Sequence, residues 1–268
     1  LRQRLETELS EILLEQERYQ DALKILSRLA YELKKATHKS QLIEVYLIES
    51  RTFRGLGDFS RAKASLTSAR TNAAASSITP TLQGELDLES GIIFLQEGEY
   101  RTASSYFMEA FDAFSTKSEK PAAAALKYNL LARILDGRAN ECQTVASGAA
   151  LVLSDYQADI DLMLDIAKAA QEKSVHMLHD VIEANREKLM SDPVIQSSLE
   201  FLVESLEEQH LLRIVRPYSA IQLGRIAEMI QLPVDHVENR LVQMILDQKL
   251  NGSINQSEGI LNIFEDEE

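Results

Sequence analysis

A short pattern that occurs three times in the first half of the chain limits the possible folds more than any other feature. In each copy an aromatic residue follows a polar turn, and an alanine comes three residues after the aromatic. The pairs are Tyr19 and Ala22, Phe59 and Ala62, and Tyr100 and Ala103, so the aromatics are 40 and then 41 residues apart. Such a period is typical of helix–turn–helix arrays, whose units bury too little surface alone and must stack on their neighbours.

The pattern also predicts how these units pack. We expect each aromatic to start the second helix of its unit and to wedge between neighbouring helices, and each alanine to let two backbones approach closely. Thr79 and Pro80 fit a helix start, with threonine as N-cap and proline at the first helical position. We therefore predict a tetratricopeptide-like helical-repeat solenoid over residues 1–190, with a period longer than the usual ~34 residues. The alternative is an irregular helical bundle whose similar turns arise by chance.

Residues 191–268 predict a winged helix, a small domain of helices followed by a two-stranded wing. Ser219 and Gln222 form a capping-box pattern before one helix, and a second amphipathic helix starts near Pro233. Its apolar face is expected to hold Val234, Val237, Leu241, Met244 and Ile245. The expected strands are 211–215, 249–254 and 260–264, the last two joined by a loop in which Gly259 can adopt a positive φ. The predicted fold class is thus mostly α, a helical-repeat arm followed by a winged helix.

The charge of the chain bears on what such a winged helix binds. The net charge is −14, and residues 191–268 contain five basic and fourteen acidic residues. The helix that begins near Pro233 has one arginine, Arg240, beside Asp235, Glu238 and Asp247. A helix that reads DNA needs polar groups at base edges and cations at the flanking phosphates. The charge pattern therefore predicts that this winged helix binds protein and not nucleic acid.

No pattern in the sequence predicts catalysis or a cofactor. His176, His179 and Glu183 have helical spacing that suits zinc, but no second His/Cys cluster completes a site. Cys142 has no local feature that would activate a thiolate. Phosphate-binding, dinucleotide-binding and hydrolase motifs are absent from the sequence. We expect a non-catalytic protein without metal or other cofactor.

Cysteine content and hydropathy bear on the compartment. A single cysteine cannot form an internal disulfide, which predicts a reducing compartment, the cytosol or the nucleus. No run reaches the ~18 apolar residues of a membrane span, so no membrane partner is expected. The chain starts at Leu1 without a signal-like segment, which indicates a piece of a longer protein.

A helical-repeat array followed by an acidic winged helix resembles the PCI module, which scaffolding subunits of the proteasome lid, the signalosome and a translation initiation factor share. Several segments look like those of a PCI subunit of the proteasome lid. They are "LIEVYLIESRTF" (42–53), "RAKASLTSARTNA" (61–73), "YFMEAFDAF" (106–114), "ALKYNLLARIL" (125–135) and "VENRLVQMILDQKLNGSINQSEGIL" (237–261). The resemblance is weak from about residue 136 to 180.

The resemblance implies a cytoplasmic and nuclear scaffold subunit of the 26S proteasome regulatory particle. Its implied partners are the other PCI subunits of the lid, and the ATPase ring and core α-ring subunits through the helical arm. Winged helices of PCI subunits associate partly through sheet edges, so the candidate interface strand is Leu250, Asn251, Gly252, Ser253 and Ile254. Such subunits have further amino-terminal repeats and a terminal helix after the winged helix, which this chain lacks. The rival interpretations are a PCI subunit of the signalosome and a winged-helix protein that binds nucleic acid.

Overall fold

The computed structural model describes residues 2–36, 39–115, 119–149 and 154–264, and the chain forms two compact units. The first unit is residues 1–168 and the second is residues 169–268. The predicted boundary between residues 190 and 191 lies inside the second unit. The reason is that α10 (Val175–Ala184) and α11 (Arg186–Met190) pack against α12 (Pro193–Val215), the helix that leads into the winged helix.

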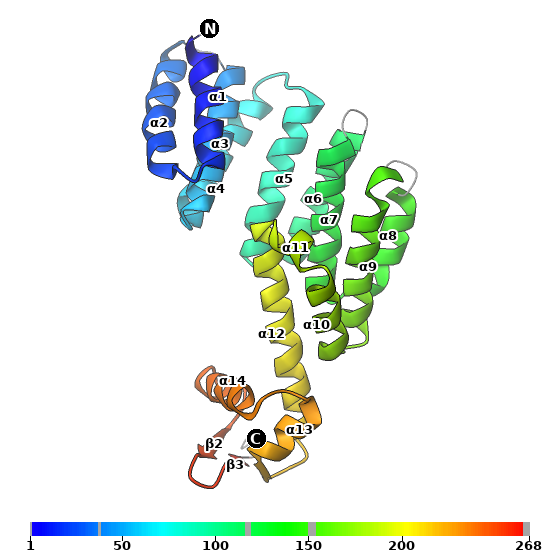
Figure 1. Ribbon diagram of the computed structural model, residues 1–268. Coiled ribbons are helices and arrows are strands. Elements are labelled where there is room, and N and C mark those ends of the chain that lie inside the picture. The colour runs from blue at the N-terminus through cyan, green and yellow to red at the C-terminus, as the bar shows by residue number, and fades with distance from the viewer. Residues whose placement is uncertain (1, 37–38, 116–118, 150–153, 265–268) are drawn as a thin grey trace. The chain divides into compact units, whose positions relative to one another are not determined.

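The first unit consists of helices that pack mainly on their neighbours in sequence (Figure 1). They are α1 (Arg2–Glu15), α2 (Tyr19–Ala36), α3 (Lys39–Gly55), α4 (Phe59–Ala74), α5 (Pro80–Gln96), α6 (Tyr100–Ser115), α7 (Glu119–Leu135), α8 (Cys142–Ala149) and α9 (Gln157–Gln171), with short 3₁₀ turns η1 (Ala139–Glu141) and η2 (Ser154–Tyr156). Helix α9 continues into the second unit. Contacts between sequence neighbours are what a stacked helical array requires, and the predicted fold class is confirmed.

The repeat extends further along the chain than the aromatic–alanine pairs indicate. The residue two positions before each predicted aromatic has a positive φ: Glu17, Gly57 and Gly98. Before the winged helix, two more turns of the same kind occur, at Gly137 and Lys173. At each turn the next N–H donates to the carbonyl five residues before it, as Asp58 does to Phe53 at 2.9 Å, which is the Schellman motif that ends a helix.

The repeat residues start the predicted helices, but the aromatics are not equivalent. Tyr19, Phe59 and Tyr100 are the first residues of α2, α4 and α6, and Ala22, Ala62 and Ala103 are completely buried. The ring of Tyr19 lies against Gly55, where a Cβ atom would come within 2.6 Å of it. Phe59, in contrast, is 39% exposed, so the expectation that it wedges between helices is wrong.

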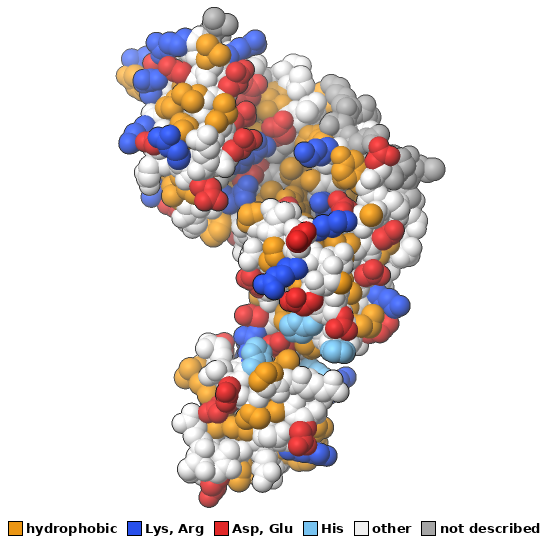
Figure 2. Space-filling view, in the orientation of Figure 1, with side chains coloured by type: hydrophobic (Ala, Val, Ile, Leu, Met, Phe, Trp, Pro, Cys, Tyr) orange, Lys and Arg blue, Asp and Glu red, His pale blue; other side chains and the backbone are white. Residues whose placement is uncertain are grey.

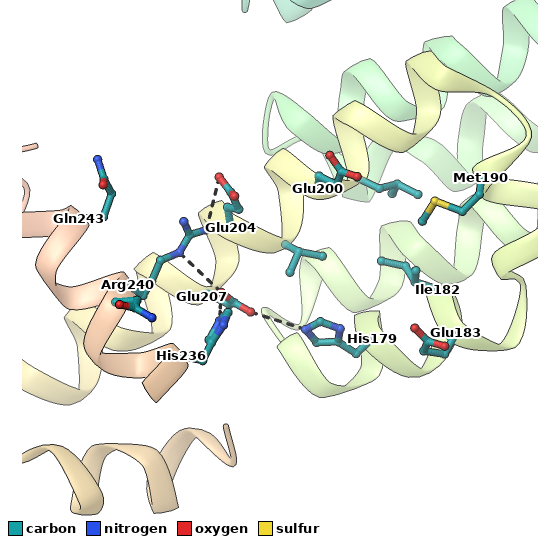
Figure 3. Close-up of a pocket in the computed structure, with 13 residues that line it drawn as sticks. His179, Ile182, Glu183, Met190, Glu200, Glu204, Glu207, His236, Arg240 and Gln243 are labelled. Atoms are coloured by element: carbon teal, nitrogen blue, oxygen red, sulfur yellow. Dashed lines mark hydrogen bonds and ion pairs between the residues drawn. The ribbon is translucent and has the colours of Figure 1, made fainter. Parts of the chain in front are cut away.

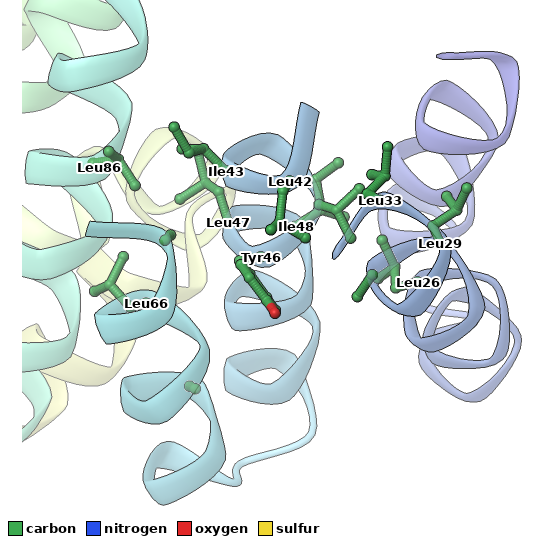
Figure 4. Packing of buried hydrophobic residues seen from close by; sticks show 14 of the residues in the cluster. Leu26, Leu29, Leu33, Leu42, Ile43, Tyr46, Leu47, Ile48, Leu66 and Leu86 are labelled. Atoms are coloured by element: carbon green, nitrogen blue, oxygen red, sulfur yellow. The ribbon is translucent and has the colours of Figure 1, made fainter. Parts of the chain in front are cut away.

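The core of the first helices is a continuous apolar cluster. Figure 4 shows leucines of α2 facing leucines and isoleucines of α3, with Leu66 of α4 and Leu86 of α5 in the same cluster. Thr79 caps α5 by accepting the N–H of Leu82 at 3.3 Å, with Pro80 next to it, which confirms the predicted helix start. Small residues let α5 approach α6 closely, since a Cβ atom on Gly91 would lie 2.5 Å from the ring of Phe107.

The second unit contains the winged helix. After α12 come β1 (Ala220–Gln222), α13 (Leu223–Ile230), α14 (Val234–Leu246), β2 (Gly252–Asn255) and β3 (Ile260–Ile263). The antiparallel sheet has the order β1-β3-β2, with Ile221 opposite Leu261 and Ile254 opposite the same residue from the other side. Gly259 has a φ of 65° at the wing turn, as predicted.

Three local predictions in this unit are wrong. Residues 211–215 continue α12 and do not form a strand, because Leu211, Ile214 and Val215 fall on one buried helical face with the apolar residues before them. Ser219 does not cap α13; Gln222 holds the N-cap position without a side-chain bond, because β1 carries the chain into the helix. Val234 is 43% exposed because it is the first residue of α14, before the buried face begins. None of the helices in the described ranges is both long and apolar enough to cross a membrane.

Candidate functional site

The free edge of the wing is a backbone surface that another protein can extend. Strand β2 pairs with β3 alone, so its other side has no strand partner among the described residues. The N–H of Phe264 donates to the carbonyl of Asn251 at 2.8 Å, which sets the alternation of the antiparallel ladder. It follows that the N–H groups of Gly252 and Ile254 face away from β3. An incoming strand could accept hydrogen bonds from both.

The structure places the predicted interface strand two residues later than expected. Leu250 is only 6% exposed and belongs to the core of the winged helix, so it cannot contribute to an open edge. Asn251 precedes the strand, and Gly252, Ser253 and Ile254 lie within β2. Gly252 is required where β2 meets β3, since a Cβ atom there would lie 2.5 Å from the carbonyl oxygen of Asn262.

In a winged helix that binds DNA, the helix that corresponds to α14 would enter a DNA groove. Here the single arginine of α14, Arg240, does not point to solvent. Arg240 is turned toward α12, with ion pairs to Glu204 at 3.4 Å and to Glu207 at 3.7 Å. On the same helix Asp235 is exposed and Glu238 is half-buried. On the face drawn in Figure 2, acidic and hydrophobic side chains near the C-terminal end of the chain are accompanied by few basic ones. This surface would repel phosphates.

A buried carboxylate connects three helices of the second unit (Figure 3). Glu207 of α12 is 3% exposed, and its Oε2 lies 3.1 Å from Nε2 of His236 in α14. Its Oε1 lies 3.6 Å from Nε2 of His179 in α10, and Arg240 approaches from α14. Burying a carboxylate without partners costs several kcal/mol, so these groups are what make its position tolerable.

The same residues line one end of a groove of about 570 Å³. Its apolar wall includes Ile182, Met190, Leu199 and Val203. No nucleophile–base pair lines it, and no group of three His, Cys, Asp or Glu side chains in the described parts of the chain could hold a metal ion.

The residues weighed for catalysis do not come together. His176 lies 3.6 Å from Asp180, whereas His179 points to Glu207, so the histidines and Glu183 do not converge on one point. Cys142 is buried, and its Sγ lies 3.7 Å from the carbonyl oxygen of Leu130. Burial raises the pKa of the Cys142 thiol to about 11, which disfavours the reactive thiolate.

Sequence reasoning missed the cluster around Glu207. A signal was present, because Glu207 occupies the helical face that also holds Leu211 and Ile214, and a charged residue on an apolar face needs a partner. The partners could not be named, since His179 and His236 lie 28 residues before and 29 residues after it.

Comparison with known proteins gives consistent results for the whole chain. Residues 178–265 match the PCI domain. The chain is 39% identical over 267 residues to 26S proteasome non-ATPase regulatory subunit 11 of Dictyostelium discoideum, which covers 100% of this chain and 65% of that protein. It is 39% identical over 266 residues to the homolog of that subunit in Arabidopsis thaliana, covering 99% of this chain and 63% of the relative. A 26S proteasome regulatory subunit of Saccharomyces cerevisiae is 32% identical over 271 residues, covering 99% of this chain and 62% of the relative.

These relatives are longer than the chain, which spans less than two thirds of their length. Within that span the similarity includes both structural units, and the PCI match covers the part that contains α12, α13, α14 and the wing. Residues 178–265 thus match the PCI domain, and the chain is similar along its whole length to non-ATPase regulatory subunit 11 of the 26S proteasome.

Proposed function

We propose that this chain is the PCI-containing part of a non-catalytic scaffold subunit of the 26S proteasome lid. In this role it helps to assemble the lid and to hold the regulatory particle on the core particle for ubiquitin-dependent protein degradation. The observation that carries the proposal is the 39% identity over 267 residues to proteins named as proteasome regulatory subunits. Because the identity extends through the helical unit as well as the PCI domain, it favours this role over that of a signalosome subunit.

In this proposal the two units contact different partners. The wing edge at Gly252 and Ile254 takes other PCI subunits of the lid, and the helical arm takes subunits of the ATPase ring and the core α-ring. The free backbone groups of β2 support the first contact, and the acidic character of the winged helix argues against nucleic acid as a partner. The helical array supports the second, because stacked helical repeats provide extended protein-binding surfaces.

Absence of catalysis and location in the cytoplasm and nucleus are part of the same proposal. The raised pKa of the Cys142 thiol and the separation of the histidines support a binding role. A single cysteine, buried as a free thiol, is compatible with a reducing compartment. Imaging of a fluorescently tagged protein in cells tests the location.

Affinity capture tests the assembly directly. The tagged chain is captured from cell extract at moderate salt, and the bound proteins are identified by mass spectrometry. Recovery of lid subunits together with proteasomal ATPases is the expected result. Recovery of signalosome subunits in their place would contradict the proposal and assign the same fold to the other complex.

A further inference from the structure

The second unit is acidic, and most of its basic side chains have a partner. Residues 169–264 contain eight basic residues. Arg225 and Lys249 pair with Glu228 and Glu208 at 3.1 and 2.7 Å. Arg186 and Arg240 also lie within ion-pair distance of glutamates, and Lys188 is engaged as well. Three cations remain without an ion pair among the residues that the structure describes.

These three, Lys173, Arg213 and Arg216, line one groove of about 380 Å³. Lys173 comes from the turn between α9 and α10, and Arg213 and Arg216 come from the C-terminal end of α12. The other lining residues, Leu206, Gln209, His210 and Leu212, include no carboxylate. We call this site the basic groove. It concentrates unpaired positive charge in a unit that is otherwise negative.

The half-buried imidazole of His210 also lines the basic groove. Nδ1 of His210 is buried and has no hydrogen-bond partner among the described residues. Burial and the neighbouring Arg213 guanidinium lower the pKa of His210. An anion placed in the groove would reduce the repulsion among the cations around this ring.

Helix geometry alone explains only part of this arrangement. Cations are favoured near helix C-termini, where Lys173, Arg213 and Arg216 all lie. The helix dipole accounts for a cation at each helix end. It does not account for the lack of a carboxylate among the residues that line the groove around the three cations. Throughout the rest of the unit, acidic residues lie close enough to pair with the available cations.

We propose that the basic groove binds an acidic segment of a partner protein, with carboxylates on the three cations and apolar side chains on Leu206 and Leu212. The apolar wall favours a peptide over a free phosphate, which would leave that wall unused. The site is separate from the wing edge and does not depend on the proposed proteasome role.

The test measures binding of a short fluorescein-labelled peptide of glutamate and leucine to the intact chain by fluorescence anisotropy. The comparison probes are the same peptide with glutamine for each glutamate, and inorganic phosphate as competitor. Two variants remove charge from the groove: Lys173→Gly, and Arg213→Gln combined with Arg216→Gln. Arg225→Gln, an exposed arginine outside the groove, is the matched control.

Lys173→Gly separates binding from folding. Lys173 has a φ of 52°, a conformation that glycine adopts without strain and that glycine holds at Gly57, Gly98 and Gly137. The variant is therefore expected to melt no lower than the parent chain and still to bind the acidic peptide more weakly. The double arginine variant should weaken binding roughly 2- to 30-fold, as expected for loss of two partly exposed ion pairs.

The outcomes divide clearly. Three results together support the proposal. The groove variants bind the peptide more weakly, Arg225→Gln binds it as the parent chain does, and the affinity decreases as the salt concentration rises from about 50 to 300 mM. Equal binding of the glutamine peptide, equal loss in the Arg225 control, or no binding by the intact chain overturns it. Displacement of the peptide by low concentrations of inorganic phosphate would assign the groove to a small anion and also overturns it.

Discussion

Oε2 of Glu207 lies 3.1 Å from Nε2 of His236, and this contact joins α12 to the first turn of α14 inside the PCI domain. Because Glu207 is almost completely buried, its ionised form depends on His236, His179 and Arg240 for compensation. The contact thus fixes the winged helix to the helix that precedes it. An assembly that uses the wing edge needs this part of the molecule to be rigid.

Removing this carboxylate should loosen the second unit. Glu207→Ala leaves Arg240 without its buried partner, and we expect the free energy of unfolding of this unit to fall by about 2–4 kcal/mol. Hydrogen–deuterium exchange read by mass spectrometry checks this, with faster exchange expected in α12 and α14 and unchanged exchange in α1 to α6. The control Glu204→Ala removes a more exposed partner of the same arginine and should cost less than about 1 kcal/mol. Equal effects of the two substitutions would contradict the role given to Glu207.

Gly91 and Gly224 should respond in opposite ways to the same substitution. A Cβ atom at Gly91 would lie 2.5 Å from the ring of Phe107, whereas one at Gly224 would have no atom within 4 Å. Gly91→Ala is expected to destabilise the first unit by about 1–3 kcal/mol through overpacking. Gly224→Ala should stabilise the second unit by about 0.5–1 kcal/mol through helix propensity. Thermal melts followed by circular dichroism check the signs, and a stable Gly91→Ala variant would show that α5 and α6 can separate at low cost.

Two buried acids of α5 differ in what their charge does for stability. Burial raises the pKa of Asp87, against the effects of a hydrogen bond from Gln83 and of Arg70, so its ionised form costs stability near neutral pH. The Glu89 carboxylate instead accepts a hydrogen bond from Nε of Arg54 at 2.8 Å. Asp87→Asn should therefore leave stability within about 1 kcal/mol of the parent or raise it, and Glu89→Gln should lower it by about 1–3 kcal/mol.

The pH dependence of the Asp87 effect has a definite sign. An acid whose pKa is raised by folding lowers the free energy of unfolding at pH values above its folded pKa. This destabilisation disappears as the pH falls below the unfolded pKa of about 3.9. Any advantage of Asp87→Asn over the parent chain should therefore shrink as the pH falls through the range between these two values. Denaturant titrations at several pH values measure it, and an advantage that grows on acidification would show that burial is not the main cause.

Cys142 should be inert in the folded chain. With a thiol pKa of about 11, the thiolate fraction at pH 8 is about 10⁻³, and the side chain is also buried. Ellman's reagent should label the native chain at least about 100-fold more slowly than the chain unfolded in guanidinium. Labelling of the native chain at the unfolded rate would show that α8 opens freely.

The local signal at Thr79 predicted a helix start, because capping involves neighbouring residues alone, whereas the capping-box pattern at Ser219 did not. Thr79 with Pro80 acts as the predicted cap of α5. Residues 211–215 misled because a short apolar run fits a strand as well as a helix, and only the long face of α12 decides between them.

The features that could not be predicted from the sequence depend on packing between residues that are distant along the chain. The fourth and fifth repeat turns were missed, partly because Lys173 occupies a position where glycine is expected. The Glu207 cluster joins residues of three helices, and the basic groove joins a turn to the end of α12, so no spacing rule brings these residues together. The exposure of Phe59 shows that a residue type that recurs at one position of a repeat need not be equally buried in each copy.

The wing edge offers the most direct test of the scaffold proposal. Ile254→Pro removes an N–H that faces away from β3, while Ile254→Ala keeps this group and removes most of the same side chain. In affinity capture with equal amounts of the two tagged variants, the measured quantity is the recovery of other lid PCI subunits. The account predicts that Ile254→Pro recovers several-fold less than Ile254→Ala, with similar circular dichroism for both. Equal recovery, or the absence of lid subunits from the captures of both variants and the parent chain, would contradict it.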